Sequence, residues 1–80
     1  MKTEILLFAG LRDEFQGSVL TVQVENLDLC VEELNALARE QFPGLENHLY
    51  KVAVNQAYVE ADFQLLGGEE IAFIPAVSGG

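Results

Sequence analysis

Cysteine is almost absent from this sequence, and the single Cys30 excludes an internal disulfide. No apolar run is long enough to cross a membrane, and no charged and then apolar leader opens the chain. Basic residues are scarce too: four Lys and Arg stand against 13 Asp and Glu, which gives a net charge of −9 at pH 7. Such a surface repels phosphate backbones and anionic lipids. We therefore expect a cytoplasmic protein that binds neither nucleic acid nor membrane and suits a basic protein partner.

Residue types that commonly carry catalysis are scarce as well. His48 is the only histidine and falls in an expected surface connection, and Cys30 has no histidine partner in a recognisable arrangement. The carboxylates occur singly or in pairs such as Asp13-Glu14, without the spacing of metal ligands, and the glycine patterns of nucleotide-binding loops are missing. The sequence predicts no catalytic constellation, no metal and no bound cofactor.

Hydrophobic residues, by contrast, make up half of the 80 residues, enough for one small domain over residues 1–80. Apolar periodicity predicts one main helix over residues 30–42, ended by Pro43-Gly44, with Asp28 as a possible cap. Residues 10–17 are expected to form a short turn or 3₁₀ piece, and residues 45–49 a further helical turn. β-Patterns occupy residues 3–9, 18–24, 50–55, 57–59 and 69–74. The order is therefore ββαβ(β)β, an α+β class with a mixed sheet of four to five strands packed on one helix.

Tight turns are predicted at two places. Asn55-Gln56 suits a turn because Asn tolerates positive φ, and Gly67-Gly68 forms the last turn before the closing strand.

The first and last strands are apolar on both faces, which is typical of strands in the centre of a sheet, side by side and parallel. One substantial helix covers one face only. The other face is then open, and an open apolar patch usually marks an interface. Alternatively, residues 10–17 and 60–66 fold over that face with Leu11, Phe15, Phe63 and Leu65.

The closing strand runs into Pro75, which we expect to end the pairing, and residues 76–80 then form an extended tail that finishes on Gly79-Gly80. Two residues without Cβ could thread a narrow active site of another enzyme, with Val77 and Ser78 as the stem. The α-carboxylate of Gly80 is a poor electrophile, so acyl chemistry there requires activation, for example by adenylation. The alternative is a small, frayed terminus without a role.

Two motifs of the sequence are specific: the V-N-Q of Val54-Asn55-Gln56 and the F-x-P-x-V-S-G-G ending of Phe73 to Gly80. Further segments are Leu7-Phe8-Ala9 with Leu11-Arg12-Asp13, Val31-Glu32-Glu33-Leu34 and Gly68-Glu69-Glu70. Together these segments resemble the small subunit of molybdopterin synthase, the MoaD family, over essentially the whole chain. Ala76 stands where a second Pro is common in the family, and Ser78 where Thr is common.

The resemblance implies a ubiquitin-like β-grasp fold and a sulfur carrier that is not an enzyme on its own. Gly80 would be adenylated with ATP by a ubiquitin-activating-like enzyme of the MoeB type and converted to a thiocarboxylate with sulfur from a donor. Residues Val77, Ser78 and Gly79 would thread into a large subunit of the MoaE type, in a heterotetramer. Sulfur would then pass to cyclic pyranopterin monophosphate to build the molybdopterin dithiolene.

The resemblance also implies a hydrophobic partner interface at Phe8, Tyr58 and Ile74. A thiamine-pathway carrier of the ThiS type shares the fold, the Gly-Gly ending and the adenylation, and remains the alternative. A ubiquitin-like interaction domain with an inert terminus, or a carrier captured by a lysine amine in protein conjugation, is also open.

Overall fold

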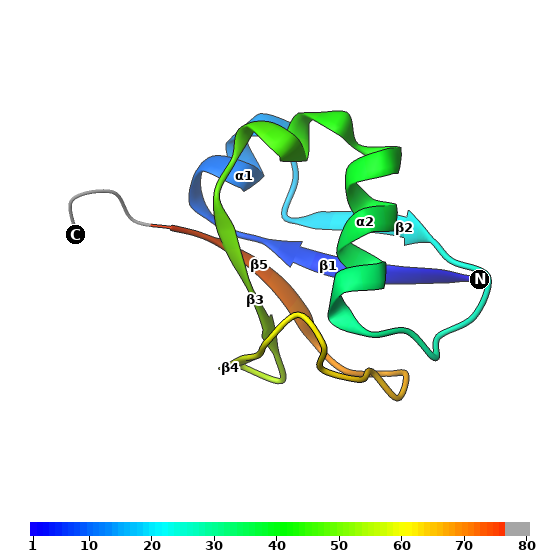
Figure 1. The fold of residues 1–80 in the computed structure, drawn as a ribbon. Coiled ribbons are helices and arrows are strands. Elements are labelled where there is room, and N and C mark those ends of the chain that lie inside the picture. Colours follow the sequence, from blue (N-terminus) through cyan, green and yellow to red (C-terminus); the bar gives the residue numbers. More distant parts are fainter. Residues whose placement is uncertain (77–80) are drawn as a thin grey trace.

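In a computed structural model of the chain, which describes residues 1–76, a five-stranded mixed sheet packs on one long helix (Figure 1). The strands are β1 (Lys2–Leu7), β2 (Val19–Gln23), β3 (Tyr50–Val54), β4 (Ala57–Tyr58) and β5 (Ile71–Pro75). The helices are α1 (Ala9–Phe15), α2 (Val31–Gln41) and the 3₁₀ segment η1 (Pro43–Asn47). The predicted ubiquitin-like β-grasp is confirmed.

The strands lie in the order β2-β1-β5-β3-β4. Strands β1 and β5 run parallel, with Ile5 opposite Ile71, and every other pair of neighbours is antiparallel. The prediction that the first and last strands lie side by side and parallel inside the sheet is therefore correct. Each of these two strands has a neighbouring strand on both edges. Each also carries apolar side chains on both faces of the sheet, the face under α2 and the opposite face.

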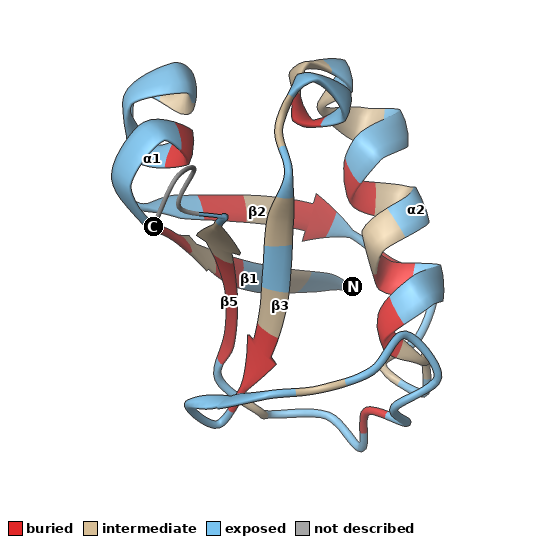
Figure 2. Cartoon of the chain, turned by 60° about the vertical axis from the view of Figure 1, so that its left-hand side comes forward, coloured by how far each residue is buried: buried red, intermediate tan, exposed pale blue. Residues whose placement is uncertain are grey.

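The core lies between α2 and the sheet face that α2 covers (Figure 2). From β1, β5 and α2 it takes Ile5, Phe73 and Leu34, each almost inaccessible to solvent. The ring of Tyr50 stacks on Phe73 with 4.5 Å between centroids, and so closes the core beside β3. Residues 18–24 contribute to the same core, since Leu20, Val22 and Val24 are all buried.

Residues 9–15 form a seven-residue α-helix, α1, where the sequence predicted only a short turn or 3₁₀ piece. Tertiary packing explains the difference. Leu11 is completely buried, and the ring of Phe15 packs edge-on against Phe42 with 6.1 Å between centroids. Gln16 then ends the helix in the left-handed conformation (φ 54°). The spacing of Leu11 and Phe15 was visible in the sequence, but the partner Phe42 was not.

The prediction of Asp28 as the cap of α2 is wrong, because Cys30 occupies the N-cap. The N–H of Cys30 donates to the Glu33 carboxylate at 2.9 Å, one side of a capping box. The Asp28 carboxylate instead accepts a hydrogen bond from Nε2 of Gln64 at 2.7 Å. Asp28 therefore ties the approach to α2 to the segment that precedes β5.

Both predicted turns are present. Asn55 (φ 51°) and Gln56 (φ 70°) connect β3 to β4, and Gly67 (φ 102°) and Gly68 (φ 84°) precede β5. The carboxylate of Glu69 accepts hydrogen bonds from the N–H of Leu66 (2.6 Å) and of Gly67 (2.8 Å). These bonds hold the turn and keep the pKa of Glu69 below its usual range.

Candidate partner-binding face

The sheet face opposite α2 has a buried layer of its own. Ala53 and Ala72 are buried, yet neither belongs to the cluster that forms the core under α2. They lie directly opposite each other on β3 and β5. Because successive side chains of a strand point to opposite faces, their neighbours Val54 and Phe73 point into the core while these two alanines point away from it.

The strand register extends this pair into an apolar row across the whole sheet. Leu6 lies opposite Val19 on one side and Ala72 on the other, and Ala53 lies opposite Tyr58. The row therefore contains one residue from each strand, in the order Val19, Leu6, Ala72, Ala53 and Tyr58. We call this set the apolar row.

Neither of the two segments that could have covered this face lies on it. Leu11 and Leu65 are buried in the core on the α2 side, and Phe15 packs against that same core. Residues 60–66 run past the start of α2, where the N–H of Val31 donates to the Phe63 carbonyl (2.9 Å) and the N–H of Glu32 to the Ala61 carbonyl (2.8 Å). Within the described residues 1–76, neither of these two segments therefore covers the apolar row.

The structure brings the three predicted interface residues to this face. Phe8 follows β1 in an extended conformation, so it points to the same side as Leu6. The register that puts Leu7 opposite Phe73 makes Phe8 the neighbour of Ile74. Phe8 is 44% exposed, Tyr58 is 63% exposed at the β4 edge, and Ile74 is half-buried between them.

Sequence reasoning missed one charged member of this face. Lys51 lies opposite Ile74, and its Nζ sits 5.4 Å from the centre of the Tyr58 ring. A cation over an aromatic face is a favourable contact at an exposed site. It gives the acidic chain a local positive charge beside the row. Only the register of β3 with β4 and β5 could have revealed it.

Pairing continues past Pro75, where the sequence predicted that it would end. Tyr50 and Pro75 are opposite each other, and the N–H of Ala76 still donates to the Leu49 carbonyl at 2.9 Å. In an antiparallel ladder alternate pairs exchange no hydrogen bonds, and Tyr50–Pro75 is such a pair. The missing N–H of Pro75 therefore costs nothing on the β3 side. The predicted threading residues Val77, Ser78 and Gly79 and the predicted reactive Gly80 lie outside the described residues.

His48 and Cys30 have structural roles. Nε2 of His48 lies 3.3 Å from Oε1 of Glu14, joining the end of η1 to α1, and Cys30 caps α2. In the described part of the chain, His, Cys, Asp and Glu form no cluster of three that could hold a metal ion. No helix among residues 1–76 is long and apolar enough to span a membrane.

Comparison with known proteins gives one family and several structures. The sequence profile of the ThiS family matches residues 5–80. SAMP1 from Haloferax volcanii is 25% identical with a TM-score of 0.79, and both chains are covered completely. The putative molybdopterin converting factor subunit 1 from Pyrococcus furiosus is 18% identical with a TM-score of 0.79, covering 96% of this chain and 99% of that one.

A third structure is a complex of subunits 1 and 2 of the molybdopterin-converting factor from Helicobacter pylori. The matching chain is 23% identical, has a TM-score of 0.67 and is covered completely, as is the present chain. The last two likenesses establish a shared fold.

Proposed function

This chain belongs to the ThiS family of ubiquitin-like sulfur carriers, and we propose that it is the sulfur-carrying small subunit of a molybdopterin synthase. The observation that carries the proposal is the apolar row, which crosses all five strands and exposes Val19 and Tyr58 at its two ends. Strand β5 contributes Ala72 to the row and leads straight into the tail. A partner seated on the row would thus lie beside the end of β5, after which the tail follows in the sequence.

In this proposal the reacting atom is the terminal carbonyl carbon of Gly80. Its carboxylate attacks the α-phosphorus of ATP on a MoeB-like activating enzyme, which releases pyrophosphate and leaves an acyl-adenylate. A hydrosulfide ion from the donor then attacks the carbonyl carbon and displaces AMP, which leaves a thiocarboxylate with no change in oxidation state. In this proposal the chain itself needs no cofactor, and Val77, Ser78 and Gly79 thread the tail into the partner.

The partner that receives the thiocarboxylate is a MoaE-like large subunit, which would bind the pterin phosphate. The net charge of −9 supports this division of labour, because an anionic substrate is better held by a basic partner. Phe8, Ile74 and Tyr58 would supply the apolar contacts, with Lys51 at the margin. The similar Helicobacter pylori chain was solved in such a complex, of subunits 1 and 2 of its molybdopterin-converting factor.

Two other outcomes are compatible with the same tail chemistry. The matching family carries the name of ThiS, the thiamine-pathway carrier. A carrier of that kind would deliver sulfur to a thiazole synthase instead. The likeness to SAMP1, a small archaeal modifier protein, favours conjugation as the second candidate, in which a lysine amine captures the activated Gly80.

A host strain that lacks this chain separates the candidates. We expect loss of molybdoenzyme activity, restored by the wild-type chain and not by a chain without Gly80. Restoration by Leu66→Asp is the matched control, because Leu66 is exposed and lies outside the apolar row. A thiamine requirement would move the chain to the thiamine pathway, and isopeptide-linked adducts in mass spectra would favour conjugation.

A further inference from the structure

A second, separate feature is the partly unpaired outer edge of β3. Hydrogen bonds from Asn55 N–H to Glu70 O (2.8 Å) and from Ala76 N–H to Leu49 O (2.9 Å) direct the odd-numbered residues of β3 toward β5. The even-numbered residues Tyr50 and Val52 therefore direct their backbone groups to the opposite edge.

Strand β4 is too short to pair that whole edge. It pairs with Ala53 and Val54, and the N–H of Val59 adds one bond to the Val52 carbonyl at 3.2 Å. Three backbone groups have no protein partner among residues 1–76: the N–H of Val52, and the N–H and C=O of Tyr50. An edge with free donors and acceptors is a template for another strand.

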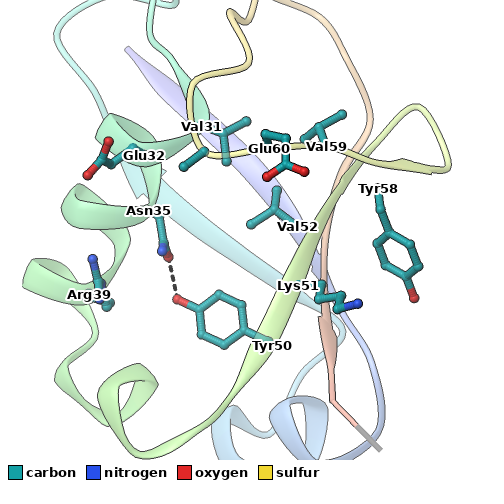
Figure 3. A pocket seen from close by; sticks show the side chains of 11 residues that line it. Val31, Glu32, Asn35, Arg39, Tyr50, Lys51, Val52, Tyr58, Val59 and Glu60 are labelled. Carbon is teal, nitrogen blue, oxygen red and sulfur yellow. Dashed lines mark hydrogen bonds between the residues drawn. The ribbon is translucent and has the colours of Figure 1, made fainter.

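A groove runs between this edge and α2 (Figure 3). Val31, Val52 and Val59 provide apolar lining, and Glu32, Asn35 and Arg39 project from the facing side of α2. The hydroxyl of Tyr50 donates to Oδ1 of Asn35, so a hydrogen bond fixes the two walls relative to each other. The groove is therefore formed before any partner arrives.

The other edge of the sheet, formed by β2, has a side chain that pairs with its backbone. On β2, the side-chain amide of Gln41 accepts from the N–H of Gln23 and donates to its carbonyl, both at 2.8 Å. This amide takes the place of a neighbouring strand at that residue. The β3 edge has no such substitute within the described residues, although it lies beside the groove.

We propose that the β3 edge and this groove bind an extended segment of a basic partner protein, which pairs with Tyr50 and Val52 as an added strand. Glu32 and Glu60 line one end of the groove, and neither forms an ion pair within residues 1–76. A Lys or Arg of the segment would lie between them, and an apolar side chain would lie over Val52. A second copy of this chain is a poor occupant, because two molecules of charge −9 repel each other.

This site borders the apolar row, because Lys51 and Tyr58 line the groove as well. The side chains of Tyr50 and Val52 face α2, whereas those of Lys51 and Ala53 face the row. The inference goes beyond the sulfur-carrier proposal, and either idea can fail alone, because the test below follows the amides of Tyr50 and Val52 and not the apolar row or the tail.

The test uses the full chain labelled with ¹⁵N and the capped peptide acetyl-Val-Thr-Val-Thr-Lys-amide, whose two valines and lysine share one face of a strand. In the free protein, the N–H groups of Tyr50 and Val52 should exchange with solvent faster than those of Lys51 and Ala53. Peptide should shift and protect the Tyr50 and Val52 amides. The double variant Glu32→Gln with Glu60→Gln should weaken binding about tenfold.

The matched control is Glu4→Gln with Glu25→Gln, which removes the same charge elsewhere and should leave the affinity within about twofold. Three results would overturn the proposal: no response of Tyr50 and Val52 at millimolar peptide, shifts centred on the β2 edge or on the apolar row, or equal binding by a peptide whose alternate amides are N-methylated.

Discussion

At the residue scale, Glu69 makes the stability of the fold decrease at acidic pH. Hydrogen bonds from Leu66 and Gly67 lower the pKa of Glu69 below its ordinary value of 4.5. The folded state then holds fewer protons than the unfolded state near that pH, so the stabilisation is complete above pH 4.5 and is lost as pH falls through the folded pKa. Between about pH 5 and about pH 3, urea denaturation should show a steeper loss of unfolding free energy for wild type than for Glu69→Gln. Parallel curves would contradict this assignment.

For Tyr50 we predict the opposite pH dependence, a loss of stability at alkaline pH. Burial raises the pKa of Tyr50 above 10.0, against the opposing effects of Arg39 and of the bond to Asn35. A raised pKa gives stability that is complete below pH 10.0 and lost as pH rises through the folded pKa.

We expect Tyr50→Phe to keep the stacking on Phe73 but to unfold about 1 kcal/mol more easily at neutral pH, because the Asn35 amide loses its partner. The wild type, and not this variant, should lose the Tyr50 contribution above pH 10. Chemical denaturation at neutral and alkaline pH measures both effects. Equal stability of the two proteins at neutral pH would show that water replaces the hydroxyl without cost.

At the scale of elements, a substitution in the turn between β3 and β4 should make the fold more stable. Gln56 adopts φ 70°, which costs an L-residue and suits glycine, and Asn-Gly is the preferred pair for such a hairpin. Gln56→Gly should therefore raise the unfolding free energy by roughly 0.5–1 kcal/mol in thermal or urea denaturation. Gly67→Ala is the opposite control: φ is 102°, a conformation that L side chains rarely adopt, so this change should destabilise. A lower stability of Gln56→Gly would mean that the Gln side chain contributes more than the backbone strain.

Elements were predictable where the signal is local. The period of residues 31–41, the alternation of residues 19–23 and the turns at Asn55-Gln56 and Gly67-Gly68 all depend on neighbours in the sequence. The errors depend on contacts that span the chain. Helix α1 needs Phe42, the Asp28 side chain is taken by Gln64, and Pro75 is harmless only in the register it has with Tyr50.

At the scale of the whole molecule, the open face follows from counting helices against faces, and the structure supports that reasoning. The membership of the apolar row was only partly predictable. Leu6 and Ala72 follow from alternation within their own strands, but Val19, Ala53 and Tyr58 join them only through the register between strands. The tail, on which the chemistry rests, is known from its residues alone.

The apolar row predicts how a large subunit should respond to single changes. Tyr58→Asp and Phe8→Asp should each weaken binding about tenfold or more, since both side chains are exposed in the free chain and would be buried against the partner. Circular dichroism should show an unchanged fold. Leu66→Asp, at a residue 85% exposed away from the row, should bind normally. Equal binding by all three variants would place the interface elsewhere.

The central claim is that Gly80 carries sulfur, and the intact mass of the chain tests it most directly. The purified chain would be incubated with a MoeB-like activating enzyme, ATP and a sulfur donor, alongside a chain without Gly80. We predict that the wild type gains the mass difference between sulfur and oxygen, located by fragmentation at Gly80, only when ATP is present. An unchanged mass of the wild-type chain, or an equal gain in the chain without Gly80, would contradict the account.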